Sequence, residues 1–112
     1  MNWNYIKEVQ QIDHYLQQSY QEPVLFFKHS IRCSVSATVL NRLERNWNPA
    51  CGLTPVYIDL INFRPVSNEL ANVLNVHHES PQAILVHKGK VVNHWSHFEI
   101  DWRVLAEAAP KS

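Results

Sequence analysis

The sequence predicts an α/β domain in which a four-stranded mixed β-sheet is flanked by four α-helices. Short apolar runs at 24–27, 56–61 and 83–86 are typical of strands that are covered on both faces. Amphipathic segments with helical spacing separate these runs. The last two strands are joined through residues 88–90, where Gly89 supplies the positive φ that a tight hairpin requires. With 112 residues, we expect a single domain that spans 1–112.

The first half of the chain predicts helix, strand, helix and strand. Residues 4–20 form an expected first helix that ends at Glu22-Pro23, before the strand 24–27. A second helix follows Cys33 and ends at Asn48-Pro49, and the next strand covers 56–61. The apolar stripes of the two helices are Tyr5, Val9, Ile12, Leu16 and Tyr20 in the first and Val35, Val39, Leu43 and Trp47 in the second.

The second half predicts a helix, two strands and a closing helix. The third helix starts at about Ser67, a plausible N-cap, with Leu70, Val73 and Leu74 facing inward. Strands at 83–86 and 91–97 follow, and a last helix spans 100–108. The resulting order α-β-α-β-α-β-β-α requires a parallel pair with a right-handed crossover and a final antiparallel hairpin. Residues 110–112 are expected to fray.

The corner between the first strand and the second helix carries the candidate chemistry. Reactive groups in α/β sheets collect at the carboxyl ends of strands, and Cys33 lies just beyond such an end. The free N–H groups and the positive dipole end of the following helix favour an anion such as a thiolate. Arg32 adds positive charge, with Lys28 and His29 further back along the chain. These polar surroundings favour a reactive cysteine over a buried structural one.

The order and spacing of the elements resemble the thioredoxin fold over essentially the whole chain. Dithiol enzymes of that fold carry Cys-x-x-Cys at this corner, whereas here the fourth position is Ser36. Such a site can attack a disulfide and form a mixed disulfide, but it cannot release the product by itself. The Ser36 hydroxyl is able to donate a hydrogen bond to the thiolate. The resemblance also implies that Pro81, in Ser80-Pro81 before the third strand, is a cis-proline beside the cysteine.

The segment HSIRCSVSA resembles the active-site segment of the monothiol bacilliredoxins, the redox proteins of the bacillithiol system. The segments VYIDLINFRPVSNELA and ESPQAILVHKGKVV are similar to that family as well. The resemblance implies that Cys33 is the attacking thiol and that Ser36 occupies the resolving position. Arg32 completes the expected catalytic set. The expected substrate-binding residues are Ser34, Ser80, Pro81 and His29.

The implied substrates are cytoplasmic client proteins that carry a mixed disulfide with bacillithiol, a small thiol used in place of glutathione. Bacillithiol itself is the expected co-substrate, and no tightly bound cofactor is expected. The family often has proline directly after the cysteine, whereas this chain has Ser34. Because a proline there restricts the helix start, this difference affects the local loop geometry.

Other site types have weaker signals. The net charge of zero gives no electrostatic reason for binding nucleic acid or an anionic membrane. The spacing of the seven histidines does not match a structural zinc site. An iron–sulfur cluster bridged through Cys33 stays possible. Cys51 follows the far end of a thirteen-residue helix, roughly 20 Å away, so it is not expected to pair with Cys33.

Two further functions stay open at this point. The chain could be a redox-inert interaction module that keeps the fold as a binding platform, in which case Cys33 would alkylate slowly. It could also be a peroxide sensor whose Cys33 is oxidised to sulfenic acid.

Overall fold

The computed structural model describes residues 1–110; the expected fraying of 110–112 falls largely outside this range. Its α-helices and longer strands agree in kind with the predicted ones, and the additions are a short strand at the N-terminus and two 3-10 helices. In chain order they are β1 Asn4–Tyr5, α1 Gln10–Gln18, β2 Val24–His29, α2 Ser34–Asn46, η1 Pro49–Cys51, β3 Thr54–Asp59, α3 Arg64–Leu74, β4 Gln82–His87, β5 Lys90–Ser96, η2 His97–Glu99 and α4 Trp102–Ala108.

The mixed sheet has five strands in the order β1-β3-β2-β4-β5, so the prediction of four strands was wrong by one. β2 and β3 are parallel, whereas β4 runs antiparallel to both β2 and β5. The extra strand is β1, which pairs with β3 through Asn4 and Tyr5. These residues are exposed, so no apolar alternation marks them as a strand, and the helical spacing that begins at Tyr5 predicted a longer first helix.

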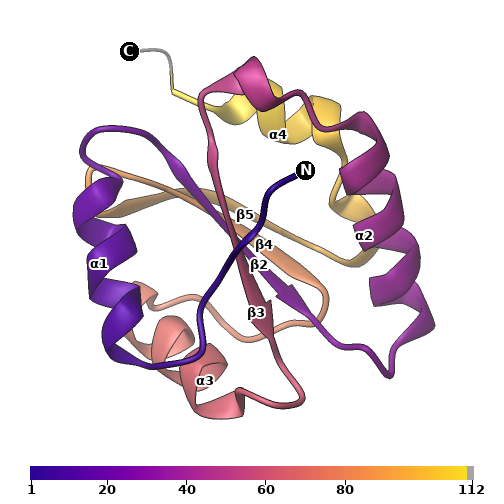
Figure 1. The fold of residues 1–112 in the computed structure, drawn as a ribbon, viewed down its shortest axis with the longest axis horizontal. Coiled ribbons are helices and arrows are strands. Elements are labelled where there is room, and N and C mark those ends of the chain that lie inside the picture. The colour runs from indigo at the N-terminus through magenta and orange to yellow at the C-terminus, as the bar shows by residue number, and fades with distance from the viewer. Residues whose placement is uncertain (111–112) are drawn as a thin grey trace.

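Helices cover both faces of the sheet, as predicted (Figure 1). α1 and α3 lie on one side of it, while α2 and α4 lie on the other. Alternate residues of β2 divide between the two cores because successive side chains of a strand point to opposite faces. Val24 and Phe26 join the core under α1 and α3, whereas Leu25 and Phe27 join the core under α2 and α4.

Three helix starts differ from the prediction. α4 begins at Trp102 rather than at residue 100, with the Asp101 side chain as its N-cap. α1 begins at Gln10 rather than at residue 4, because the backbone before it is held by other partners. Ile6 donates its N–H to the Tyr57 carbonyl of the sheet, and the N–H groups of residues 7 and 8 donate to the Gln11 side chain. α3 begins at Arg64, and Ser67 is a buried residue within the helix rather than its N-cap. Proline at the second position of α3 supports the earlier start, since its fixed φ suits the first turn.

The carboxyl ends of β2 and β3 point to the same edge of the sheet (Figure 1). This edge leads into α2 through the loop 30–33 and into α3 through the loop 60–63. The start of β4 lies beside the end of β2, because Lys28 pairs with Gln82. The fold therefore brings three loops to the edge at which Cys33 lies. Within residues 1–110, no helix is both long and apolar enough to cross a lipid bilayer.

Candidate active site

Cys33 is the N-cap residue of α2, as the sequence predicts. Its backbone is extended, with φ −109° and ψ 119°, and the helix starts at the next residue. The Cys33 carbonyl accepts the first helical hydrogen bond, from Ala37 N–H at 3.1 Å. The Cys33 N–H donates to the Ser30 carbonyl, also at 3.1 Å. The thiol is free and partly exposed, and it lies at the N-terminal end of α2, where the free N–H groups of a helix favour negative charge.

Ser36 lies one turn further along α2 and is fully buried. Its Oγ accepts a hydrogen bond from Ser30 N–H at 3.1 Å and lies 2.7 Å from His29 Nδ1. Within residues 1–110, no hydrogen bond joins Ser36 to Cys33. The Ser36 hydroxyl therefore does not donate the expected hydrogen bond to the Cys33 sulfur. It is hydrogen-bonded to His29 and Ser30 of the preceding strand and loop instead.

His29 is the last residue of β2 and is only 5% exposed. Burial lowers its pKa below the ordinary 6.5, although the negative charges of Asp59 and Glu44 act in the opposite direction. Its ring stacks on Phe27 with centroids 6.1 Å apart and lies 5.7 Å from the Tyr57 ring. His29 is therefore a neutral, firmly held side chain near pH 7, beneath the loop that carries Cys33.

The remaining expected site residues lie on the loops at this edge. Arg32 and Ser34 are exposed on either side of Cys33. The Ser80-Pro81 peptide bond is cis, as the resemblance implies. Continuing the β2–β4 register by one pair beyond Lys28 and Gln82 brings Pro81 alongside His29, close to the start of the cysteine loop.

Lys28 does not contribute to this site in the way its position in the sequence suggests. Its side chain faces the α1–α3 side of the sheet and is completely buried. Lys28 Nζ lies 3.3 Å from His78 Nδ1, and burial lowers the pKa of Lys28 to about 8. The pKa of His78 is lowered too, first by burial and then by the charges of Lys28 and Arg64. The sequence signal for this pair is a lysine that directly continues an apolar strand, a pattern that fits a buried side chain better than added charge near the thiol.

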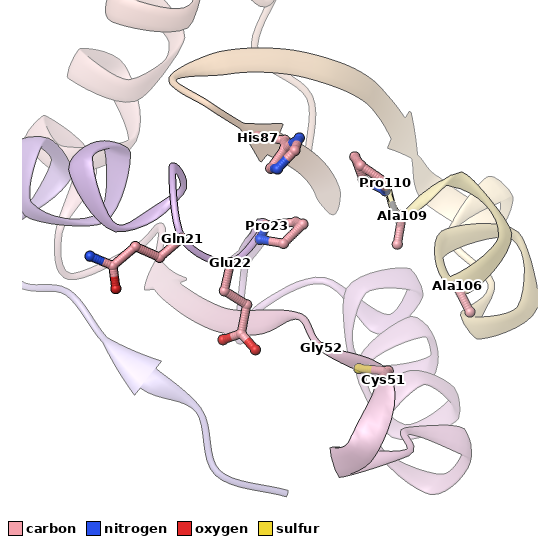
Figure 2. A pocket seen from close by; sticks show the side chains of 9 residues that line it. All are labelled: Gln21, Glu22, Pro23, Cys51, Gly52, His87, Ala106, Ala109 and Pro110. Atoms are coloured by element: carbon pink, nitrogen blue, oxygen red, sulfur yellow. The ribbon is translucent and has the colours of Figure 1, made fainter. Parts of the chain in front are cut away.

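Cys51 lies in η1, beyond the end of α2 opposite to Cys33. It is a free thiol, and burial raises its pKa above the ordinary 9.0. The thiol borders a hollow of about 400 Å³, seen in Figure 2 with Glu22 and His87 on its rim. The thirteen-residue α2 separates this hollow from the reactive corner, in agreement with the expectation that Cys51 is not the partner of Cys33.

The described residues offer no ready metal centre. Among residues 1–110, no three side chains of histidine, cysteine, aspartate or glutamate are grouped closely enough to hold a metal ion.

Comparisons with solved structures support the fold. A proposed oxidoreductase with a thioredoxin fold superimposes with a TM-score of 0.78 and 26% sequence identity, covering 94% of this chain and 91% of the other. Thioredoxin from Fasciola hepatica gives a TM-score of 0.73 at 10% identity, covering 93% of both chains. Thioredoxin from Trypanosoma brucei brucei gives 0.73 at 15% identity, covering 96% of this chain and 87% of the other. The architecture is thus a thioredoxin-like fold.

The model of the family described as "Monothiol bacilliredoxin BrxC" matches residues 4–105, a range that runs from β1 into the first part of α4 and includes all the expected site residues. Together with the fold, this match supports a thiol redox protein whose single corner cysteine stands at a helix N-terminus. The chain belongs to the monothiol bacilliredoxin family.

Proposed function

We propose that this protein removes bacillithiol from client proteins by thiol–disulfide exchange at Cys33. The observation that carries the proposal is a free, partly exposed cysteine at the N-cap of α2, in a chain whose fourth motif position is a buried serine. Family membership supports bacillithiol as the small thiol involved.

The exchange has two steps that balance in atoms and electrons. The Cys33 thiolate attacks the bacillithiol sulfur of the mixed disulfide, and the client sulfur leaves as a thiolate that takes up a proton from water. Cys33 is then disulfide-bonded to bacillithiol. A second bacillithiol thiolate attacks that sulfur, which forms bacillithiol disulfide and returns Cys33 as a thiolate. The client thiol is regenerated, and the incoming bacillithiol is the reductant, so one added bacillithiol is oxidised for each client thiol released.

Individual residues serve distinct parts of this scheme. The N–H groups at the start of α2 favour the anionic forms of the attacking and leaving sulfur. Arg32, exposed beside the thiol, supplies positive charge at the mouth of the site. Ser34, exposed at the start of α2, and the backbone of the cis Ser80-Pro81 segment are assigned to substrate binding in this scheme. Because position 36 is a serine, the Cys33 adduct is not resolved within the chain and waits for an external thiol.

The test uses a model protein carrying one bacillithiol mixed disulfide and intact-mass spectrometry of both proteins. The wild-type chain should acquire one bacillithiol as the client loses it, and added bacillithiol should remove the adduct. Cys33→Ser should abolish the transfer. The matched control Cys51→Ser should transfer at the wild-type rate.

The outcomes also separate the two other functions. Failure of the wild-type chain to take up bacillithiol, with slow alkylation of Cys33, would leave a redox-inert interaction module. Failure of transfer with rapid formation of a Cys33 sulfenic acid in peroxide would indicate a sensor instead.

A further inference from the structure

The loop that carries Cys33 is closed by a small hydrogen-bond network centred on Ser36. Ser36 Oγ accepts from Ser30 N–H at 3.1 Å and lies 2.7 Å from His29 Nδ1. The Ser30 carbonyl in turn accepts from Cys33 N–H at 3.1 Å. One residue, Ser30, is thus tied by its N–H to Ser36 and by its carbonyl to Cys33. The geometry of the nucleophile loop depends on the Ser36 hydroxyl.

Which groups donate and which accept hydrogen bonds in this network depends on the protonation state of His29. A serine hydroxyl has one proton to donate and two lone pairs that accept. Ser30 N–H uses one lone pair, and a neutral His29 with an unprotonated Nδ1 accepts the Ser36 proton, so each of these groups has a partner. If Nδ1 carries a proton, it must donate to Ser36 instead. Among residues 1–110 the buried Ser36 hydroxyl makes no hydrogen bond besides those to His29 and Ser30, so in this arrangement its proton would be left without an acceptor.

We infer that His29 is a positioning residue for Cys33, which it holds in place through Ser36 and Ser30. Neutral His29 accepts a hydrogen bond from the Ser36 hydroxyl, which directs this hydroxyl away from the thiol and fixes the loop. The inference rests on the proposed function only in taking Cys33 as the reactive thiol. Ser36, at the resolving position, then has the structural role of holding the loop that carries Cys33.

The surroundings of His29 favour its neutral form. The imidazole is enclosed by Phe27 of its own strand and by Tyr57 of β3. Asp59 of β3 and Glu44 of α2 are the negative groups that act on it, and their effect is smaller than that of burial. Burial therefore lowers the pKa of His29 below its ordinary value, and protonation of Nδ1 ends the hydrogen bond that Ser36 donates to this nitrogen.

The test measures Cys33 alkylation by iodoacetamide from pH 4.5 to 8 in a Cys51→Ser background. Iodoacetamide needs no bacillithiol, so the readout is independent of the substrate. The wild-type rate should show an inflection from His29 below pH 6.5. His29→Phe preserves an aromatic ring beside Phe27 but has no acceptor, and it should slow alkylation at pH 7 about tenfold, since it leaves the buried hydroxyl without its acceptor.

His29→Asn is the conservative variant, because its side-chain oxygen accepts from Ser36 but does not titrate. It should restore most of the rate lost in His29→Phe, and the inflection should be absent. His94→Phe, an exposed histidine on β5, is the matched control and should keep the wild-type profile. Nitrogen NMR of the wild type should show His29 with its proton on Nε2, and Ser36→Ala should shift the Nδ1 resonance.

Two results would overturn the inference. One is a proton on Nδ1 of neutral His29. The other is an identical pH profile in wild type and His29→Asn. If the His29-dependent profile is observed but no bacillithiol is transferred, the proposed function fails and the positioning role stands. If bacillithiol is transferred and the profile lacks the inflection, the positioning role fails alone.

Discussion

Replacing Lys28 by methionine should stabilise the protein at neutral pH. The Lys28 side chain is fully buried, and within residues 1–110 no carboxylate forms an ion pair with it. Burial lowers its pKa from the ordinary 10.5 to about 8. At 1.36 kcal/mol per pH unit, holding the charged form in the folded protein costs about 3 kcal/mol. Lys28→Met removes this cost and the hydrogen bond to His78, worth about 1 kcal/mol, so a net gain of about 2 kcal/mol is expected.

The pH dependence provides a sharper check than the magnitude. Between pH 8 and 10.5 the unfolded chain keeps the Lys28 proton while the folded protein has lost it. The unfolded state therefore binds more protons, and the free energy of unfolding rises with pH in this window. The full cost is present below pH 8 and has vanished above 10.5. The advantage of Lys28→Met over wild type should thus shrink steadily as the pH rises above 8.

The assay is urea unfolding followed by tryptophan fluorescence, under reducing conditions, from pH 7 to 9.5. The pKa of Tyr57 is raised to about 12, mainly by burial, so Tyr57 lowers stability only above pH 10, and its effect is common to both proteins. Lys90→Met, an exposed lysine at the start of β5, is the matched control and should change little. A Lys28→Met protein that is less stable at pH 7, or whose difference from wild type does not vary with pH, would refute the reasoning.

Two further predictions concern the motif and the last helix. Ser36→Cys restores Cys-x-x-Cys, so this variant should release the Cys33 adduct without added thiol, whereas the wild type should retain it. The mass of the adduct is followed over time, and equal release rates in the two proteins would contradict the resolving role of position 36. Rapid release by wild type that is lost in Cys51→Ser would instead make Cys51 the resolving thiol. Asp101→Ala removes the N-cap side chain of α4, which accepts a hydrogen bond from Arg103 N–H at 2.9 Å, and should lower the free energy of unfolding by about 1 kcal/mol. Urea unfolding measures this, and an unchanged midpoint would show that the cap is dispensable.

Most of the fold was predictable because the central strands of the sheet consist mainly of apolar residues. All six residues of β2 and the first five of β4 are buried, and such strands appear in the sequence as apolar runs. The stripe from Val35 to Trp47 likewise predicted α2. β1 could not be found in this way, because a two-residue exposed strand is held only by backbone hydrogen bonds to β3, and backbone groups carry no sequence signal.

The site was predictable in outline and not in its contacts. The strand–helix corner follows from element order, and it placed Cys33 at the helix N-terminus. The partners of Ser36 do not follow, because they depend on where the loop returns and on which face of β2 each side chain occupies. The Cys-x-x-Ser spacing predicts that Ser36 interacts with Cys33, three residues before it. In the structure, the side chain of Ser36 is instead hydrogen-bonded to His29, seven residues before it.

Lys28 and His29 show how one strand separates two kinds of polar chemistry. They are neighbours in sequence and point to opposite faces of the sheet, and burial lowers the pKa of both. For His29 the shift favours the neutral form at pH 7, in which its ring nitrogen accepts the Ser36 proton beneath the reactive loop. For Lys28, with a pKa of about 8, the charged form still dominates at pH 7, so the protein retains a buried cation beside His78. The same physical cause thus gives a stable acceptor on the α2 side and a destabilising charge on the α3 side. Substitutions at the two positions should therefore change stability in opposite directions near neutral pH.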